Sequence, residues 1–282
     1  MAGYLIITIV TLFCLLPFIL VVSGSFTSEE AIHKYGYSFI PKVVSTRAYE
    51  IIFKAPEKIL DAYVISIAVT CIGTLLGLFI TSMTAYVLQS KGFKYRDRFA
   101  FFFYFTTLFS GGLVPFYILM VRYLQLKNSI VALIIPNLLA AFYILIMRNF
   151  MKSIPDSIAE SAKIDGAGEF RIFTQLMLPL IGPALASIGL FIALGYWNDW
   201  AAAMLYIDNP RMYPLQYLLY KMVNSVNFAV TATASAGVPM PEMPQQSIKL
   251  AMTVVSIGPI VLLYPFVQKY FVKGITLGSV KG

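Results

Sequence analysis

The chain has 282 residues, of which 59% are hydrophobic and 12% charged, and its mean hydropathy is +0.79. A water-soluble domain is typically about 45–50% apolar, so this composition excludes one and indicates a polytopic membrane protein. The net charge is +8. Because the basic residues lie beside apolar runs, we attribute this charge to loops at a membrane surface and not to nucleic-acid binding.

Six charge-free apolar runs are long enough to cross roughly 30 Å of hydrocarbon. We expect each to be helical, because lipid offers no partners for backbone polar groups. The first run lacks a basic start and is longer than the apolar part of a signal peptide, so we interpret it as a span. The expected spans cover residues 4–26, 62–88, 99–121, 129–147, 180–207 and 250–268.

An even number of spans places both termini on one side of the membrane. The basic run KGFKYRDR (residues 91–98) indicates that this side is the cytoplasm. The cytoplasmic segments would then include a loop at about 149–178, and the outer segments would include a long loop at about 208–249. No repeat or domain boundary is evident, so residues 1–282 are expected to form a single transmembrane domain.

Three motifs interrupt the apolar runs. GTLLG (residues 73–77) has the spacing of small residues that favours close helix packing. SGGLVP (residues 110–115) weakens its helix at Gly111 and Gly112, which indicates either a simple kink or the lining of a translocation path. YWNDW (residues 196–200) is the most polar point within any span.

Asp199 in YWNDW would be costly in lipid, which makes it a candidate functional residue. It could equally lie at the outer interface, where tryptophans are common. Aromatic faces beside an amide and a carboxylate suit a sugar, which presents C–H faces and hydroxyls. The candidate substrate path therefore comprises Gly111, Gly112, Tyr196, Trp197, Asn198, Asp199 and Trp200.

Several signatures of chemistry are missing from the sequence. It contains no GxxxxGK[ST] phosphate loop, no Ser/His/Asp set or paired carboxylates within the spans, and a single histidine, His33. Cys14 and Cys71 both lie in apolar runs and suggest neither a disulfide nor a metal site. We therefore expect no catalytic residues, no metal site and no cofactor bound by this chain.

The segment ESAKIDGAGEF (residues 160–170) is a charged interruption between two spans. SIPD, beginning at Ser153, has the form of a helix start, and Gly166 can end the helix in a left-handed conformation. A second helical run from residue 169 is expected to stop at Pro179. The first helix, about nine residues or roughly 13 Å long, is too short to cross a bilayer and should lie along the cytoplasmic face.

This short helix could rest on lipid headgroups or bind another protein. Four acidic residues would be unfavourable on an anionic lipid surface, so a protein partner fits better. These residues are Asp156, Glu160, Asp165 and Glu169.

The sequence ESAKIDGAGEFRIFTQLMLPLIGP resembles the cytoplasmic EAA loop of permease subunits of binding-protein-dependent ABC importers. RNFMKSIPDS, YWNDW and the ending YPFVQKYFVKGITLGSVKG resemble the carbohydrate, maltose-type branch of that family, and SGGLVP and MYPLQY resemble its oligo- or polysaccharide-importing subgroup. The residues in register with the EAA pattern are Glu160, Ser161, Ala162, Asp165, Gly166, Ala167, Phe173, Leu178, Pro179 and Pro183.

The resemblance implies an all-α type I importer permease in the bacterial cytoplasmic (inner) membrane, with six transmembrane helices and a cytoplasmic coupling helix. That helix would dock on an ABC ATPase, with the chain itself doing no chemistry and ATP and Mg held by the ATPase dimer. The residues implied in docking are Glu160, Ser161, Ala162, Asp165, Gly166, Ala167 and Phe170, and a second contact with the ATPase is implied for the tail residues Gly278, Ser279, Val280, Lys281 and Gly282.

The further partners implied are a second homologous permease, an extracytoplasmic sugar-binding protein that meets the 208–249 loop, membrane lipid, and the transported oligosaccharide or polysaccharide. Two other functional classes would need residues of a different kind. A stand-alone secondary transporter or channel would need coupling-ion sites, for which Asp199 is the candidate. A membrane enzyme would need paired acidic or nucleophilic groups, which the sequence does not supply.

Overall fold

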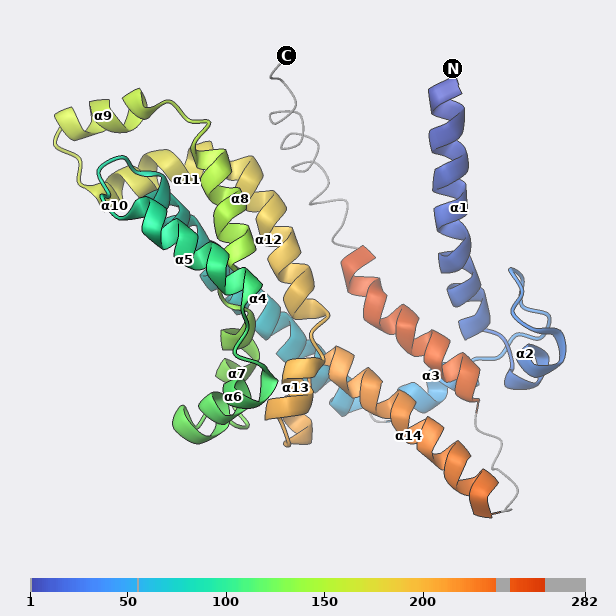
Figure 1. The fold of residues 1–282 in the computed structure, drawn as a ribbon. Helices are drawn as coiled ribbons and strands as arrows, with labels where there is room; N and C mark the ends of the chain where they lie inside the picture. Colours follow the sequence, from blue (N-terminus) through green and yellow to red (C-terminus); the bar gives the residue numbers. More distant parts are fainter. Residues whose placement is uncertain (1, 55, 237–243, 262–282) are drawn as a thin grey trace. The chain divides into compact units, whose positions relative to one another are not determined.

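A computed structural model describes residues 2–54, 56–236 and 244–261, which form helices joined by turns and one isolated β-bridge between Thr27 and Val44. The chain divides into two compact units (Figure 1). Of the described residues, the first unit contains 2–63 and 215–261, and the second contains 64–214. Helix α4 (Pro56–Gln89) begins in the first unit and continues into the second.

The first unit begins with the apolar helix α1 (Ala2–Ser25), whose side chains are almost all exposed, as lipid contact requires. Two short helices follow, α2 (Glu29–Tyr35) and α3 (Arg47–Ile52). The unit is completed by α14 (Leu215–Ala236) and by a helix over residues 245–261. The segment that we expected to be an outer loop thus contains a 22-residue helix.

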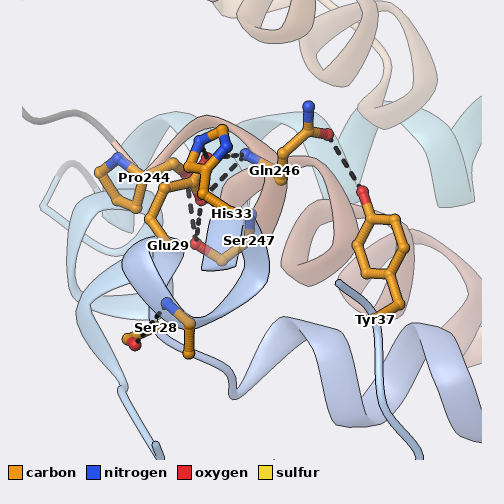
Figure 2. A network of polar contacts seen from close by, with 8 residues as sticks. Ser28, Glu29, His33, Tyr37, Pro244, Gln246 and Ser247 are labelled. Carbon is orange, nitrogen blue, oxygen red and sulfur yellow. Dashed lines mark hydrogen bonds and ion pairs between the residues drawn. The ribbon is translucent and has the colours of Figure 1, made fainter. Parts of the chain in front are cut away.

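A carboxylate from α2 caps the 245–261 helix in the first unit (Figure 2). Glu29 accepts hydrogen bonds from the backbone N–H groups of Gln246 (2.9 Å) and Ser247 (3.0 Å) and from the Ser247 hydroxyl (3.1 Å). The two backbone N–H groups belong to the first turn of the helix, where such donors have no partner within the helix and negative charge is favourable. His33 Nε2 lies 3.4 Å from Glu29, and the Tyr37 hydroxyl donates to the Gln246 side chain.

The second unit contains the rest of α4 and the helices from α5 to α13. Its bounds are α5 (Arg96–Leu108), α6 (Leu113–Ile118), a π-helical turn (Leu119–Tyr123), α7 (Ile130–Ile134), a 3₁₀ turn (Ile135–Asn137), α8 (Ala141–Met151), α9 (Asp156–Ile164), α10 (Glu169–Arg171), a π-helical stretch (Ile172–Met177), α11 (Leu178–Leu180), α12 (Gly182–Trp197), α13 (Ala201–Tyr206) and a 3₁₀ turn (Pro210–Met212). In Figure 1, α9 and α10 lie at one end of this unit, and α6, α7 and α13 lie at the other.

Two single helices in the described residues are long and apolar enough to cross a bilayer, Gly3–Ser25 and Pro56–Gln89. Three further spans are possible if each is a pair of bent helices. The pairs are Arg96–Leu108 with Leu113–Tyr123 (109°), Ile130–Asn137 with Ala141–Met151 (56°), and Glu169–Leu180 with Gly182–Trp197 (84°). The last expected span, 250–268, extends beyond the described residues, so six spans stay a prediction.

The bends interrupt the spans that we expected at 99–121 and 129–147, and each has a local cause. The weakening of the helix predicted at SGGLVP is confirmed by the first bend. Gly112 adopts φ +87°, a conformation that glycine reaches without steric cost, and it precedes α6. Pro136 lies in the 3₁₀ turn between α7 and α8 and lacks the N–H that a continuing helix needs. The third bend falls at Ile181, two residues after Pro179, where we expected the helix to stop.

The core of the second unit includes close contacts between glycines and large side chains. The Cα of Gly73 lies against the ring of Tyr196, so an added Cβ would come within 2.5 Å of that ring. Gly189 in α12 accommodates Leu78 of α4 in the same way. The packing role predicted for GTLLG is confirmed, because Gly73 and Gly77 both meet atoms of other helices.

Candidate functional site

The short helix predicted between two spans is α9 (Asp156–Ile164), nine residues long. The prediction that Ser153 starts it is wrong. Pro155 is the residue that precedes the first turn, and the Ser153 hydroxyl instead donates to the Phe150 carbonyl of the preceding helix (2.6 Å). Proline fits this position because its fixed φ of −60° leads into a helix and its missing N–H has no helical partner there.

Gly166 ends α9 as predicted. Its φ of +79° lies in the left-handed region, its N–H bonds the Lys163 carbonyl (3.0 Å), and the Ala167 N–H bonds the Ala162 carbonyl (2.9 Å). This pair of bonds is the Schellman arrangement, which satisfies the last carbonyls of a helix and turns the chain sharply. Gly166 therefore sets the angle between α9 and the helix that follows.

Most side chains of α9 are exposed among the described residues. Glu160, Ser161 and Asp165 are exposed, and Ala162 and Ala167 are half-buried. Ile164 is 86% exposed, and Phe170 at the start of the next helix is 65% exposed. Two such apolar side chains beside exposed acidic residues suit a protein surface better than water. The docking role of these residues stays a prediction.

Ion pairs connect α9 to the elements around it. Lys91 Nζ lies 2.5 Å from Asp156 Oδ2, and this hydrogen bond raises the pKa of Lys91. Lys163 Nζ lies 2.5 Å from Glu169 Oε1, while the other oxygen of Glu169 accepts a hydrogen bond from the Tyr86 hydroxyl (2.6 Å). Asp156 and Glu169 are thus both paired, whereas Glu160 has no basic side chain within ion-pair distance among the described residues.

Two of the motifs that interrupt apolar runs, SGGLVP and YWNDW, contribute residues to a cavity of about 840 Å³ in the second unit. This volume is within the range of small-molecule sites. Gly111 and Gly112 line one side, and Asn198 and Asp199 line another. SGGLVP and YWNDW, which lie about 85 positions apart in sequence, are therefore brought to one site.

Asp199 is held in place at the cavity by two hydrogen bonds. Its Oδ2 accepts from Asn137 Nδ2 (2.7 Å), and its Oδ1 accepts from the Ala202 backbone N–H at the start of α13 (3.0 Å). Among the described residues that line the cavity, Asp199 alone carries a charge. Asp199 thus lines this cavity, and its place in a substrate path stays a prediction.

The three aromatic residues of YWNDW do not line this cavity. Tyr196 and Trp197 are buried, and the Tyr196 hydroxyl donates to the Ile134 carbonyl (2.9 Å) while its ring fills the space left by Gly73. Trp200, 39% exposed, precedes the first turn of α13. Neighbouring residues of YWNDW therefore have different surroundings, because α12 ends at Trp197 and the chain turns before α13 begins.

The sequence interpretation missed most of the lining residues, among them the polar or aromatic Phe116, Asn137 and Tyr206. A signal for Asn137 was present, because the dipeptide Pro136–Asn137 places a breaker and an amide within an otherwise apolar run. Phe116 and Tyr206 gave no such signal, since aromatic residues are frequent throughout the chain. The tail residues 278–282, predicted to contact an ATPase, lie outside the described residues.

Comparison with known proteins supports the motif evidence. Residues 73–277 match the model of the family described as binding-protein-dependent transport system inner membrane component. The chain is 41% identical to the polygalacturonan/rhamnogalacturonan transport system permease protein YtcP of Bacillus subtilis, over 96% of this chain and 94% of that protein. It is 29% identical to the arabinooligosaccharides transport system permease protein AraQ of Halalkalibacterium halodurans, over 99% of this chain and 95% of that protein.

A solved structure agrees with this fold. A chain of a bacterial ABC transporter involved in the import of the acidic polysaccharide alginate matches with a TM-score of 0.81 and 30% identity, covering 96% of this chain and 95% of that one. These relatives are transport permeases, which are non-catalytic membrane subunits, as expected from the absence of a phosphate loop in the sequence. The chain belongs to the family of binding-protein-dependent transport system inner membrane components.

Proposed function

We propose that the chain is a transmembrane subunit of an ATP-driven importer for oligosaccharides or polysaccharides in the bacterial cytoplasmic membrane. In this proposal both termini are cytoplasmic, and α9 docks in a groove of an ABC ATPase subunit. Closure of the ATPase dimer moves α9, and the spans then alternate between inward-open and outward-open states. A second permease completes the path, and an extracytoplasmic binding protein delivers the sugar.

The observation that carries this proposal is helix α9, which has exposed side chains and a hydrogen-bonded C-terminal end. Its end is fixed by the Schellman bonds at Gly166, while Glu160, Ile164 and Phe170 are exposed together at one end of the second unit. A side chain such as Ile164, at 86% exposure, is costly in water and favourable in an apolar groove. Glu160 would then pair with a basic residue on the rim of that groove.

The cavity supports a carbohydrate substrate. It combines the Asp199 carboxylate and the amides of Asn137 and Asn198 with the ring of Phe116. Hydroxyl groups of a sugar can donate to the carboxylate and exchange hydrogen bonds with the amides, and C–H faces can pack on the ring. The relatives named above transport oligosaccharides or polysaccharides, and we extend that substrate class to this chain.

Further contacts belong to the same proposal. The tail residues 278–282 would reach the ATPase dimer, and the 208–249 segment, which carries α14, would meet the binding protein. The second permease would close the open side of the cavity. ATP and Mg would be held entirely by the ATPase subunits.

The docking role is tested by Glu160→Lys, with Glu57→Lys as the matched control because Glu57 lies in the first turn of α4 and is not part of α9. Both variants should reach the membrane in normal amounts. With Glu160→Lys, the ATPase subunit that co-purifies should fall about tenfold, because a hydrogen-bonded charge pair is replaced by repulsion. Wild-type co-purification and wild-type uptake of a mixed neutral and acidic oligosaccharide panel by this variant would contradict the proposal.

A further inference from the structure

Both ends of α9 are tied to one short segment, Tyr86–Lys91, at the end of α4. We propose that this segment receives the movement of α9 and that α4 carries it to the cavity. The inference rests on the proposed function, since it names the residues through which docking would reach the substrate path. Tyr86, Lys91, Asp156, Lys163 and Glu169 are positioning residues in this proposal, and we call their contacts the α4 clamp.

The first arm of the α4 clamp joins Lys91 to Asp156, the first residue of α9, at 2.5 Å. Lys91 lies two positions after the last residue of α4. Both side chains are partly exposed, so the pair can break and re-form as the elements move. This arm fixes the start of α9 next to the end of α4.

The second arm runs from Lys163, near the end of α9, through Glu169 to the Tyr86 hydroxyl. Tyr86 is only 6% exposed, and its ring lies 5.5 Å from the ring of Phe173, which is 1% exposed. Phe173 also lies edge-on to Phe79, about two helical turns before Tyr86 in α4. The second arm therefore connects α9 to a well-packed part of α4.

The α4 clamp is needed because the chain itself provides no short connection between α9 and α4. Tyr86 and Glu169 are 83 positions apart. The covalent exits from α9 lead to α8 on one side and, through Gly166 and Gly168, to α10 on the other. A movement of α9 therefore reaches α4 only through non-covalent contacts, and the α4 clamp supplies a contact at each end of α9.

Helix α4 in turn contacts the wall of the cavity. From Tyr86 to Gly73 the helix extends about 20 Å. At Gly73 the backbone of α4 lies against the ring of Tyr196, whose hydroxyl bonds the Ile134 carbonyl. The neighbours Gly195, Asn198 and Asp199 line the cavity. A shift of α4 would thus carry Tyr196 and the adjoining cavity wall with it, through packed elements of the kind that carry coupling between sites.

The experiment uses the complete transporter in proteoliposomes, with Cys14→Ser and Cys71→Ser as background and Ser110→Cys as a reporter in the cavity. The labelling rate of the reporter by an uncharged maleimide is measured with and without ATP and vanadate. The test variant combines Tyr86→Phe with Lys91→Ala, which removes one contact from each arm. The matched control combines Tyr104→Phe with Lys94→Ala, because both side chains are exposed and neither makes a hydrogen bond or ion pair among the described residues.

In the test variant, the ATP-dependent change in labelling rate should shrink about tenfold, the typical factor for a hydrogen bond to a charged group. ATP hydrolysis and subunit content should stay within about twofold of the parent, and the control should match the parent. A third variant keeps Tyr86 and exchanges the charges of the first arm, with Lys91→Asp and Asp156→Lys together. Because this pair can still form, the labelling response should match that of the parent.

An unchanged labelling response in the test variant would overturn the proposal. Loss of the ATPase subunits from the test variant would overturn it as well, because the contacts would then serve docking and not transmission. Failure of the proposed function looks different, since Glu160→Lys would then leave the ATPase bound or the parent reporter would show no response to ATP.

Discussion

At the end of the second unit that carries α9, the elements are joined by ion pairs whose side chains are between 45% and 73% exposed. At the cavity end, the contacts are a buried tyrosine packed on a glycine and hydrogen bonds anchored on Asp199. Exposed ion pairs are weak individually and easily rearranged, whereas glycine-to-ring packing has little freedom to adapt. The comparison suggests that the α9 end can change partners during a transport cycle, while the cavity end moves as a packed body.

The largest effect is expected from Gly166→Pro. Proline holds φ near −65° and has no N–H, so it can adopt neither the φ of +79° nor the bond to the Lys163 carbonyl. Uptake should fall on the order of 100-fold, with the protein still present in the membrane, because such a proline costs about 3 kcal/mol. Gly168→Ala is the matched control, since Gly168 has φ −71° and open space around it. Equal uptake by the two variants would contradict a role for the α9 terminus.

An intermediate effect is expected from Asp199→Ala at the cavity end. This change removes the acceptors for Asn137 and for the Ala202 N–H, and we expect uptake to fall about tenfold. The exchange variant, with Asn137→Asp and Asp199→Asn together, keeps one carboxylate and one amide at the same contact. It should recover most of the uptake, measured on the same oligosaccharide panel. If Asp199→Ala transports like the parent, with the same substrate preference, Asp199 has only an anchoring role.

The smallest effect is expected from ionic strength. Raising salt from about 0.1 M to about 1 M shortens the Debye length from about 10 Å to about 3 Å, which weakens exposed ion pairs more than buried packing. The ratio of sugar transported to ATP hydrolysed should fall about twofold in the parent and less in Lys91→Ala, which has already lost one pair. A salt response that is identical in these two proteins would break the contrast between the two ends.

The sequence interpretation was most successful where a feature is contiguous along the chain. The bounds of α9 and the left-handed Gly166 follow from local rules for helix ends, although the choice of Pro155 over Ser153 depended on where the Ser153 hydroxyl finds an acceptor. The cavity depended on contacts between distant positions, such as Asn137 with Asp199, 62 positions apart. Composition identified YWNDW as polar, but it did not separate the packed Tyr196 from the cavity-lining Asp199.

The Glu29 cap on the 245–261 helix has a consequence for biogenesis. The two partners are 217 positions apart, so the cap cannot form until synthesis has passed Gln246. Until then, the Glu29 carboxylate has none of these N–H donors and no helix to stabilise. The first unit is thus assembled from segments far apart in the sequence, and a truncation before residue 246 would leave α2 without the helix that it caps.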